Sequence, residues 1–494
     1  MNNIPTIKLG LISVSRNCFP IELSETRRHA VAAACGKAGV EIYDCPVTVE
    51  NESDAQKAVK DVLAAGVNAL VVYLGNFGPE TPETMLAKFF GGPVMYCAAA
   101  EDDGNKLVDG RGDAYCGMLN CSYNLGLRGI RAYIPEYPVG TAAEVAEMIR
   151  EFLPIATALV GLSELKVITF GPRPSDFNAC NAPIQPLYDL GIEYEENSEL
   201  DLLVAFNSHK DDPRIPGVMA DMAAELGEGN KMAGILPRLA QYELTLLDWA
   251  EEHKGARKHV VIAGKCWPAF QTEFGFVPCY VNSRLTAKGI PVSCEVDVYG
   301  AVSEYIGTCV TGTPVTLLDI NNSVPANLYD EDIRGRFDFR LNETFMGFHC
   351  GNTPICRLNK GEMRYQLIMK RSLEPDSEPN ITRGTLEGDI AAGEITFFRL
   401  QGNARGQLKA YAAEGEVLPV ATRSFGGIGI FAIPEMNRFY RHVLIQKQFP
   451  HHGAVAFGHV GKALFEIFKL LGVEDIGYNQ PKSLPYPTEN PFVK

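Results

Sequence analysis

The sequence predicts an α/β protein in which two consecutive Rossmann-like domains precede a β-rich, barrel-like domain with helices. The chain has 494 residues, too many for a single hydrophobic core. Apolar strands alternate with helices over its first two thirds, whereas the last third consists of short alternating runs broken by Gly, Asn and Pro. We therefore expect domains at residues 1–163, 164–345 and 346–494.

The N-terminal domain alternates strand and helix. We expect strands at residues 7–14, 40–45, 68–74 and 94–99, and helices at residues 24–37, 53–65 and 141–159. Ser24 is of the type that caps a helix N-terminus, so it is the predicted cap of the first helix. Short apolar strands at this spacing are typical of a parallel sheet with helices on both faces.

The same pattern restarts at residue 165 and predicts a second α/β domain that runs to roughly residue 345. Its expected strands are residues 165–170, 202–206 and 259–263, and its expected helices are residues 217–226 and 235–253. This domain would carry two acidic residues discussed below, Glu295 and Asp319.

The third domain differs in character. Short alternating runs at residues 337–341, 364–369, 384–389, 394–400 and 407–413 predict an antiparallel barrel or sandwich. Two helices, residues 435–448 and 459–471, would end the domain. Residues 479–494 contain four prolines and are expected to be extended.

Composition indicates an ordinary soluble globular protein, which we expect in the cytoplasm. The net charge of −15 argues against nucleic-acid binding, which needs a basic face. The longest apolar runs are too short to span a bilayer, and the first residues lack the basic start and apolar run of a secretory signal. The thirteen cysteines form no CxxC pair, so reduced thiols are expected and a zinc ribbon is not.

Three residues far apart in the chain, Glu295, Asp319 and His452, are the strongest candidates for chemistry. Each lies in an apolar segment, where an unpaired carboxylate would take up a proton or bind a cation. Two carboxylates and an imidazole suit a divalent metal. On their own, the carboxylates could equally cap a helix or pair with an arginine. Asp297 could be a ligand or a supporting partner.

The motifs around these residues resemble the L-fucose/L-arabinose isomerase superfamily, most closely its L-fucose isomerase side. The resemblance rests on residues 292–298, on the turn at residues 310–313 and on residues 317–320, with the family's gap of 24 residues between Glu295 and Asp319. The His-His-Gly at residues 451–453, followed by Gly-His-Val-Gly at 458–461, matches the family's histidine motif.

This resemblance implies a metal-dependent aldose–ketose isomerase that works through a cis-enediol. Glu295, Asp319 and His452 would hold the metal, and the two carboxylates would also move the proton. His349 resembles a histidine that arabinose isomerases use near their metal, so it is a possible fourth ligand. The implied metal is Mn²⁺, with Mg²⁺ or Co²⁺ as alternatives, and the implied assembly is a hexamer.

Six further residues are predicted to contact the sugar. They are Arg16, Tyr73, Asn76, Trp267, Gln271 and His451. Arg16 follows the first strand, where hydroxyls or an anionic group would bind, and a family arginine near this point contacts sugar, often across a subunit boundary. Trp267 beside the amide of Gln271 offers ring stacking and hydroxyl recognition, although such pairs are also common in cores.

Other functions remain open on the sequence alone. Two α/β lobes in series also build non-enzymatic sugar-binding proteins. An isomerase of the same family could act on a hexose that is sulfonated or phosphorylated at C6, and the same scaffold could support an epimerase or an aldolase.

Overall fold

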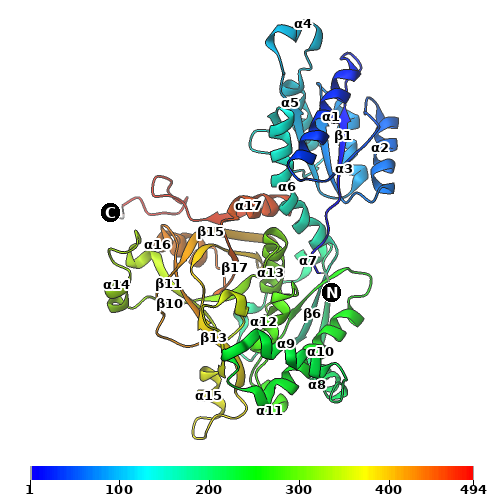
Figure 1. Ribbon diagram of the computed structural model, residues 1–494. Coiled ribbons are helices and arrows are strands. Elements are labelled where there is room, and N and C mark those ends of the chain that lie inside the picture. Colours follow the sequence, from blue (N-terminus) through cyan, green and yellow to red (C-terminus); the bar gives the residue numbers. More distant parts are fainter. Residues whose placement is uncertain (1–2, 493–494) are drawn as a thin grey trace. The chain divides into compact units, whose positions relative to one another are not determined.

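The computed structural model describes residues 3–492, which form two compact units (Figure 1). The N-terminal unit is Pro5–Val160. The C-terminal unit is Gly161–Lys494, to which Asn3 and Ile4 also belong. The fold has the predicted class, with parallel α/β sheets followed by a large β-rich sheet.

The N-terminal unit is a doubly wound α/β fold. Its all-parallel sheet has the order β2-β1-β3-β4-β5. The strands are β1 (Leu9–Val14), β2 (Ile42–Asp44), β3 (Ala69–Leu74), β4 (Val94–Ala99) and β5 (Val139–Gly140). The main helices are α1 (Ile21–Lys37), α2 (Glu52–Ala64), α3 (Glu80–Phe90), α5 (Ala114–Leu127) and α6 (Ala142–Ser163). The strand order reverses between β1 and β3, and ligands of such folds bind at this switch point.

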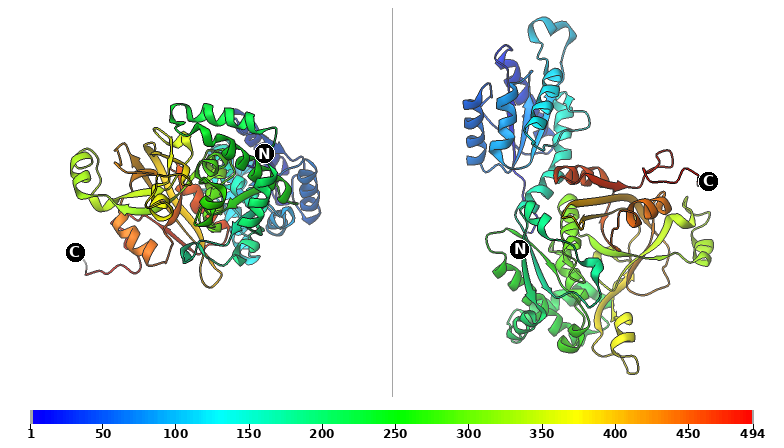
Figure 2. Two further views of the ribbon diagram at one scale, coloured as in Figure 1. Left: turned by 90° about the horizontal axis from the view of Figure 1, so that it is seen from below. Right: turned by 180° about the vertical axis from the view of Figure 1, so that it is seen from behind.

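The C-terminal unit begins with a second parallel sheet, of order β7-β6-β8-β9. Its strands are β6 (Leu165–Gly171), β7 (Glu193–Ser198), β8 (His259–Ala263) and β9 (Val292–Ser293). The accompanying helices include α8 (Glu199–Ser208), α9 (Ile215–Leu226), α10 (Leu236–His253), α11 (Ala269–Phe274) and α12 (Cys279–Ala287). In Figure 2 most of these green helices lie on the side of the parallel sheet, and α12 packs against β13 of the barrel.

The second half of this unit is a barrel. A nine-stranded sheet runs in the order β12-β13-β16-β11-β10-β17-β14-β15-β18, and an additional pairing of β15 with β16 closes six strands into a ring. The ring strands are β10 (Thr316–Ser323), β11 (Thr344–His349), β14 (Gly393–Gly402), β15 (Leu408–Leu418), β16 (Gly427–Ala432) and β17 (His452–Phe457). The outer strands are β12 (Glu362–Tyr365), β13 (Arg383–Asp389) and β18 (Asp475–Tyr478). This confirms the barrel-like prediction.

Helix α13 (Val298–Thr311) joins the two halves of the C-terminal unit (Figure 1). It is buried over most of its length and contacts β8 of the parallel sheet and β14 and β17 of the barrel. One hydrophobic core continues from the parallel sheet into the barrel, for example from Phe170 to Phe397. The residues that begin and follow α13 are therefore held rigidly against both sheets.

Several predicted elements are wrong. Residues 202–206 belong to helix α8, because Ser198 and Asp201 form a capping box that starts a helix there. Residues 337–341 form a turn leading into a short 3₁₀ helix, and residues 364–369 divide between β12 and a helix at Leu367–Leu373. Ser24 does not cap α1, which begins at Ile21; its hydroxyl donates to the carbonyl of Val14 instead (2.7 Å).

The remaining expectations concern cysteines and membranes. All thirteen cysteines are free thiols, as predicted. Within residues 3–492, no helix combines the length and the apolar character that crossing a bilayer requires. Residues 479–492 contain no helix or strand, and the last two residues of the predicted extended tail lie outside the described chain.

Candidate metal centre

Glu295, Asp319 and His452 converge in the C-terminal unit. His452 Nε2 lies 3.2 Å from Asp319 Oδ1 and 3.3 Å from Glu295 Oε2. The side chain of His452 is 1% exposed, that of Glu295 12% and that of Asp319 19%. Three residues separated by up to 157 positions in sequence thus share one site with little exposure to solvent.

Strand pairing brings Asp319 and His452 together. They are directly opposite each other in the antiparallel pair of β10 and β17. A bulge between Ile320 and Asn322 interrupts the next pairing, of β10 with β11. Bulges next to a site commonly re-aim side chains. Asp319 therefore lies within a strand of the barrel, whereas Glu295 follows a strand of the parallel sheet.

A strained turn presents Glu295. It follows β9 at the carboxyl end of the parallel sheet, and both Glu295 and Val296 have positive φ, 52° and 53°. A β-branched residue in this conformation is an outlier, and such strain is concentrated at functional sites. The turn directs the carboxylate of Glu295 toward the barrel residues.

Two oxygens of this cluster have no hydrogen-bond partner. Glu295 Oε2 and Asp319 Oδ1 are buried and accept no hydrogen bond, although both lie beside His452 Nε2. Buried acceptors are normally satisfied, so unpartnered carboxylate oxygens that face one point need an explanation. Two ionised carboxylates and a neutral imidazole fit a divalent cation in charge and in ligand type.

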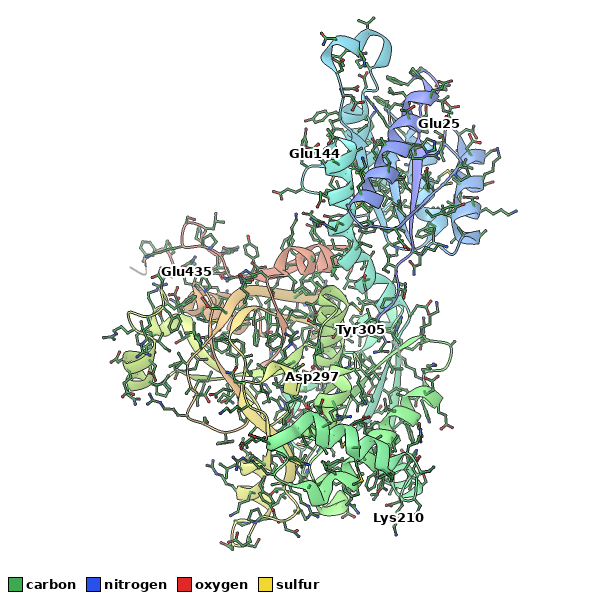
Figure 3. All side chains as sticks on the ribbon, viewed as in Figure 1. Glu25, Glu144, Lys210, Asp297, Tyr305 and Glu435 are labelled. Carbon is green, nitrogen blue, oxygen red and sulfur yellow. The ribbon has the colours of Figure 1, made fainter. Side chains whose placement is uncertain are left out.

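A buried ion pair contacts His452 at Nδ1, the ring nitrogen that faces away from Glu295 and Asp319. His452 Nδ1 lies 2.8 Å from Asp297 Oδ2, and the guanidinium of Arg399 donates to both oxygens of Asp297 at 2.8 Å. Asp297 also caps helix α13 by accepting from the amide of Gly300. Figure 3 labels Asp297 in the interior of the C-terminal unit. The carboxylate fixes the ring of His452, as partners of metal-bound histidines do.

Burial and mutual pairing set the charges of these groups. Burial alone would raise the pKa of Glu295, but the neighbouring imidazoles of His349 and His452 hold it well below its usual range. The pKa values of Asp297 and Asp319 are lowered against burial in the same way, by Arg399 and His452 respectively. Burial would lower the pKa of His452, yet its carboxylate partners raise it well above the usual value. The carboxylates are therefore ionised at neutral pH.

Two further predicted histidines join the cluster. His349 Nε2 lies 3.7 Å from Glu295 Oε2, and His451 Nε2 lies 3.8 Å from Asp319 Oδ1. His349 is 4% exposed, whereas the side chain of His451 is 34% exposed. Burial and the neighbouring His452 lower the pKa of His451, so its ring is neutral at neutral pH.

Trp267 is linked to His451 of the site through one aromatic residue, and Gln271 hydrogen-bonds to Gln366. Phe177 makes edge-to-face contacts with Trp267 (6.1 Å between ring centroids) and with His451 (5.5 Å). Gln271 is fully buried, and its amide donates to Gln366 Oε1 at 3.2 Å.

The other predicted sugar-binding residues lie in the N-terminal unit. Arg16 and Asn76 follow β1 and β3, at the switch point of the sheet. Asn76 is buried and accepts from the amide of Arg16 (3.0 Å), so it holds the two loops together. The guanidinium of Arg16 lies over the ring of Phe77 and is partly exposed. Tyr73 is buried within β3, with 2% exposed.

Sequence reasoning missed Arg399, Cys180 and Phe177. Arg399 lies in a strand whose sequence is otherwise an ordinary apolar run. Its complete burial marks it as part of the site, and burial cannot be inferred from the sequence. Cys180 Sγ lies 3.4 Å from His452 Nδ1 and comes from the loop after β6. A charged residue in an apolar strand was the only hint of Arg399, and no local pattern indicated the other two.

Two models of protein domain families match parts of this chain. Residues 10–163 match the family model described as fucose/sulfoquinovose isomerase, N-terminal domain, and residues 347–477 match L-fucose isomerase, C-terminal domain. Together the two models cover more than half of the chain.

Three bacterial proteins named sulfoquinovose isomerase are similar to this chain. The protein from Alkalicoccus urumqiensis is 24% identical over 67% of this chain and 69% of its own length. The one from Clostridium sp. is 27% identical over 43% of each chain, and that from Priestia aryabhattai is 23% identical over 65% of this chain and 66% of its own.

The alignment with solved structures is weak. A periplasmic solute-binding protein from Actinobacillus succinogenes with bound D-allose aligns over 57% of this chain and 83% of its own, with 10% identity and a TM-score of 0.15. A likeness of this size has no bearing on fold or function.

Proposed function

Because the chain belongs to the family of fucose and sulfoquinovose isomerases, we propose that it is a metal-dependent aldose–ketose isomerase whose substrate is a hexose with an anionic group at C6. The observation that carries the proposal is the convergence of Glu295, Asp319 and His452, with two unpartnered carboxylate oxygens beside one imidazole nitrogen.

The metal would be held by Glu295, Asp319 and His452. We propose Mn²⁺, with Mg²⁺ or Co²⁺ as alternatives, because two carboxylates and one imidazole are acceptable to all three ions. When bound, such an ion supplies a Lewis acid for the negative charge that develops on the sugar oxygens.

The side chains of the site would move the proton. Glu295 and Asp319 are ionised because pairing holds their pKa values below the usual range, so either can accept the proton from one carbon and return it to the other. The cis-enediol that forms between the two transfers would need exclusion of water. Burial of Glu295 and His452 supports this exclusion.

The relatives' names guide the proposal for the substrate. Each is called sulfoquinovose isomerase, and sulfoquinovose carries a sulfonate at C6. Arg16 remains our candidate for contact with this anion across a subunit boundary, as the family resemblance implies, and its guanidinium is partly exposed. Trp267, Phe177 and His451 would present ring surfaces and an imidazole to the sugar.

A substrate panel tests the proposal. The protein loaded with Mn²⁺ would be incubated in D₂O with sulfoquinovose, glucose 6-phosphate, L-fucose and D-arabinose, and products followed by NMR. We expect a ketose from sulfoquinovose, with deuterium at C1 or C2 wherever the transferred proton exchanges with solvent. The Arg16→Met variant should raise KM for the anionic sugar and leave that for a neutral sugar unchanged.

The same panel distinguishes the other functions. Sugar binding that survives chelation, with no product, would identify a sugar-binding protein and overturn the proposal. An aldose product of altered configuration would identify an epimerase, and shorter products an aldolase. Conversion of L-fucose alone would retain the isomerase but contradict the anionic substrate.

We also propose a homohexamer, on the strength of the family resemblance. Light scattering of the purified protein would give a mass near six times 54.0 kDa if this is correct.

A further inference from the structure

His349 and His452 both direct Nε2 toward Glu295, but their opposite nitrogens have different partners. His452 Nδ1 lies 2.8 Å from the ionised carboxylate of Asp297, which can only accept a hydrogen bond. When His452 binds a cation its ring must be neutral, and the remaining proton is then on Nδ1, which leaves the lone pair of Nε2 for the cation.

The ring of His349 has the opposite arrangement of proton and lone pair. Its Nδ1 accepts a hydrogen bond from the backbone N–H of Cys350, at 3.0 Å. A backbone amide can only donate, so Nδ1 of His349 must supply the lone pair. In the neutral ring the proton is then on Nε2, and a nitrogen that carries a proton cannot bind a metal.

The surroundings of His349 leave little freedom to reverse this arrangement. The residue is 4% exposed at the end of β11, and Cys350 follows it directly, so the donor is part of the same backbone. Coordination through Nε2 would move the proton to Nδ1, against the N–H of Cys350, and two donors would then face each other. The N–H of Cys350 would then lose its acceptor, and a buried donor without an acceptor is costly.

The Nε2–H of His349 instead faces an oxygen that needs a donor. Glu295 Oε2 is 3.7 Å away and accepts no hydrogen bond. This separation is longer than a direct hydrogen bond, and a small movement of either side chain would close it. Hydrogen bonds of this kind often tighten only in the complex with substrate.

We propose that His349 is a positioning residue, which donates from Nε2 to the carboxylate of Glu295 and does not bind the metal. This rests on the proposed function, because it assigns roles around the same cation. It replaces the fourth ligand implied by the resemblance to arabinose isomerases with a three-ligand site of Glu295, Asp319 and His452.

Metal affinity separates the two roles. In His349→Gln the side-chain amide can still donate, whereas His452→Gln removes the proposed ligand and serves as the matched control. Titration of each chelated protein with Mn²⁺ should give a Kd for His349→Gln within about threefold of the unaltered protein, and a Kd at least tenfold weaker for His452→Gln. An equal loss of affinity in both variants would overturn the assignment.

The absorption spectrum of Co²⁺ in the site gives a second measurement. Its visible bands respond to the loss of a nitrogen ligand, so they should remain unchanged in His349→Gln and change in His452→Gln. If His349→Gln does not fold, His349→Asn provides the same comparison with a shorter amide. Altered Co²⁺ bands in a folded His349 variant would contradict the proposal.

Measurements of kcat and KM test the positioning role. We expect kcat to fall at least tenfold in His349→Leu, which cannot donate, and to recover in part in His349→Gln, with KM little changed. Equal kcat in both variants and the unaltered protein would overturn that role. If the unaltered protein binds Mn²⁺ but isomerises no sugar, the proposed function fails while the affinities still decide whether His349 is a ligand.

Discussion

The pairing of Asp297 with Arg399 decides which nitrogen of His452 is available. Both groups are fully buried, so each would be costly without the other. Arg399 keeps Asp297 ionised, and Asp297 in turn keeps a proton on His452 Nδ1. The chain from Arg399 through Asp297 to His452 therefore controls the metal site without contributing a ligand.

Replacement of Asp297 by Asn tests this chain. An amide at position 297 could donate to His452 Nδ1, which would place the ring proton on Nε2 and remove the lone pair. We expect Mn²⁺ affinity to fall about 10- to 100-fold, measured by calorimetric titration. Asp212→Asn, at another aspartate paired with an arginine (Arg214), is the control and should bind Mn²⁺ normally. Unchanged affinity in Asp297→Asn would contradict the supporting role.

Glu83 in the N-terminal unit gives a test that depends on pH. Its side chain is fully buried, neither oxygen has a hydrogen-bond partner, and burial raises its pKa to about 8 from 4.5. Below pH 4.5 the group is neutral in both folded and unfolded chains, and between pH 4.5 and 8 the unfolded chain loses the proton first. Stability therefore falls as pH rises through this window.

Glu83→Gln should remove this pH dependence. We expect the variant to be more stable than the unaltered protein at pH 8.5, by up to about 5 kcal/mol, and similar to it at pH 5. Urea unfolding at both pH values measures the difference. Glu41→Gln, at an exposed glutamate, is the control. A stability difference that is the same at pH 5 and 8.5 would refute the explanation.

At the scale of elements, the close approach of β17 to β14 holds His452 opposite Asp319. Gly453 follows His452, and a Cβ atom there would lie 2.1 Å from Cε1 of Phe397. The missing side chain lets the barrel close at this point, so the position of His452 depends on its neighbour.

Gly453→Ala should displace β17. We expect a loss of about 1–3 kcal/mol in stability from overpacking, seen as a lower thermal midpoint, together with weaker Mn²⁺ binding. Gly217→Ala in helix α9 meets no atom within 4 Å, so it should stabilise by about 0.5–1 kcal/mol. Equal thermal midpoints for Gly453→Ala and the unaltered protein would show that the barrel accommodates the methyl group.

The sequence predicted several strands and helices well. β4 and β8 have the expected bounds, and α9 and α10 differ by one or two residues. The strand predicted at residues 202–206 is wrong because five consecutive apolar residues show no period that would separate a strand from a helix. The capping box that begins four residues earlier is the local signal for a helix. Nothing local could assign β10 to the barrel, since its partners β11 and β17 are distant in sequence.

The candidate site was predictable only in part, for a related reason. Glu295, Asp319 and His452 stand out as polar residues in apolar segments, and their spacing resembles a known family. Their supports come from separate elements, the loop after β6 for Cys180 and strand β14 for Arg399. Contacts of this kind depend on tertiary structure, which no short motif records.

For the whole molecule, the central claim is that one divalent cation held by Glu295, Asp319 and His452 makes the protein an isomerase. The most direct measurement is titration of the chelated protein with Mn²⁺, with bound metal and conversion of sulfoquinovose recorded in the same samples. We expect activity to rise in proportion to bound Mn²⁺ and to reach its maximum at one ion per chain, with neither binding nor activity in Glu295→Gln. Full isomerase activity in the metal-free protein would contradict the claim.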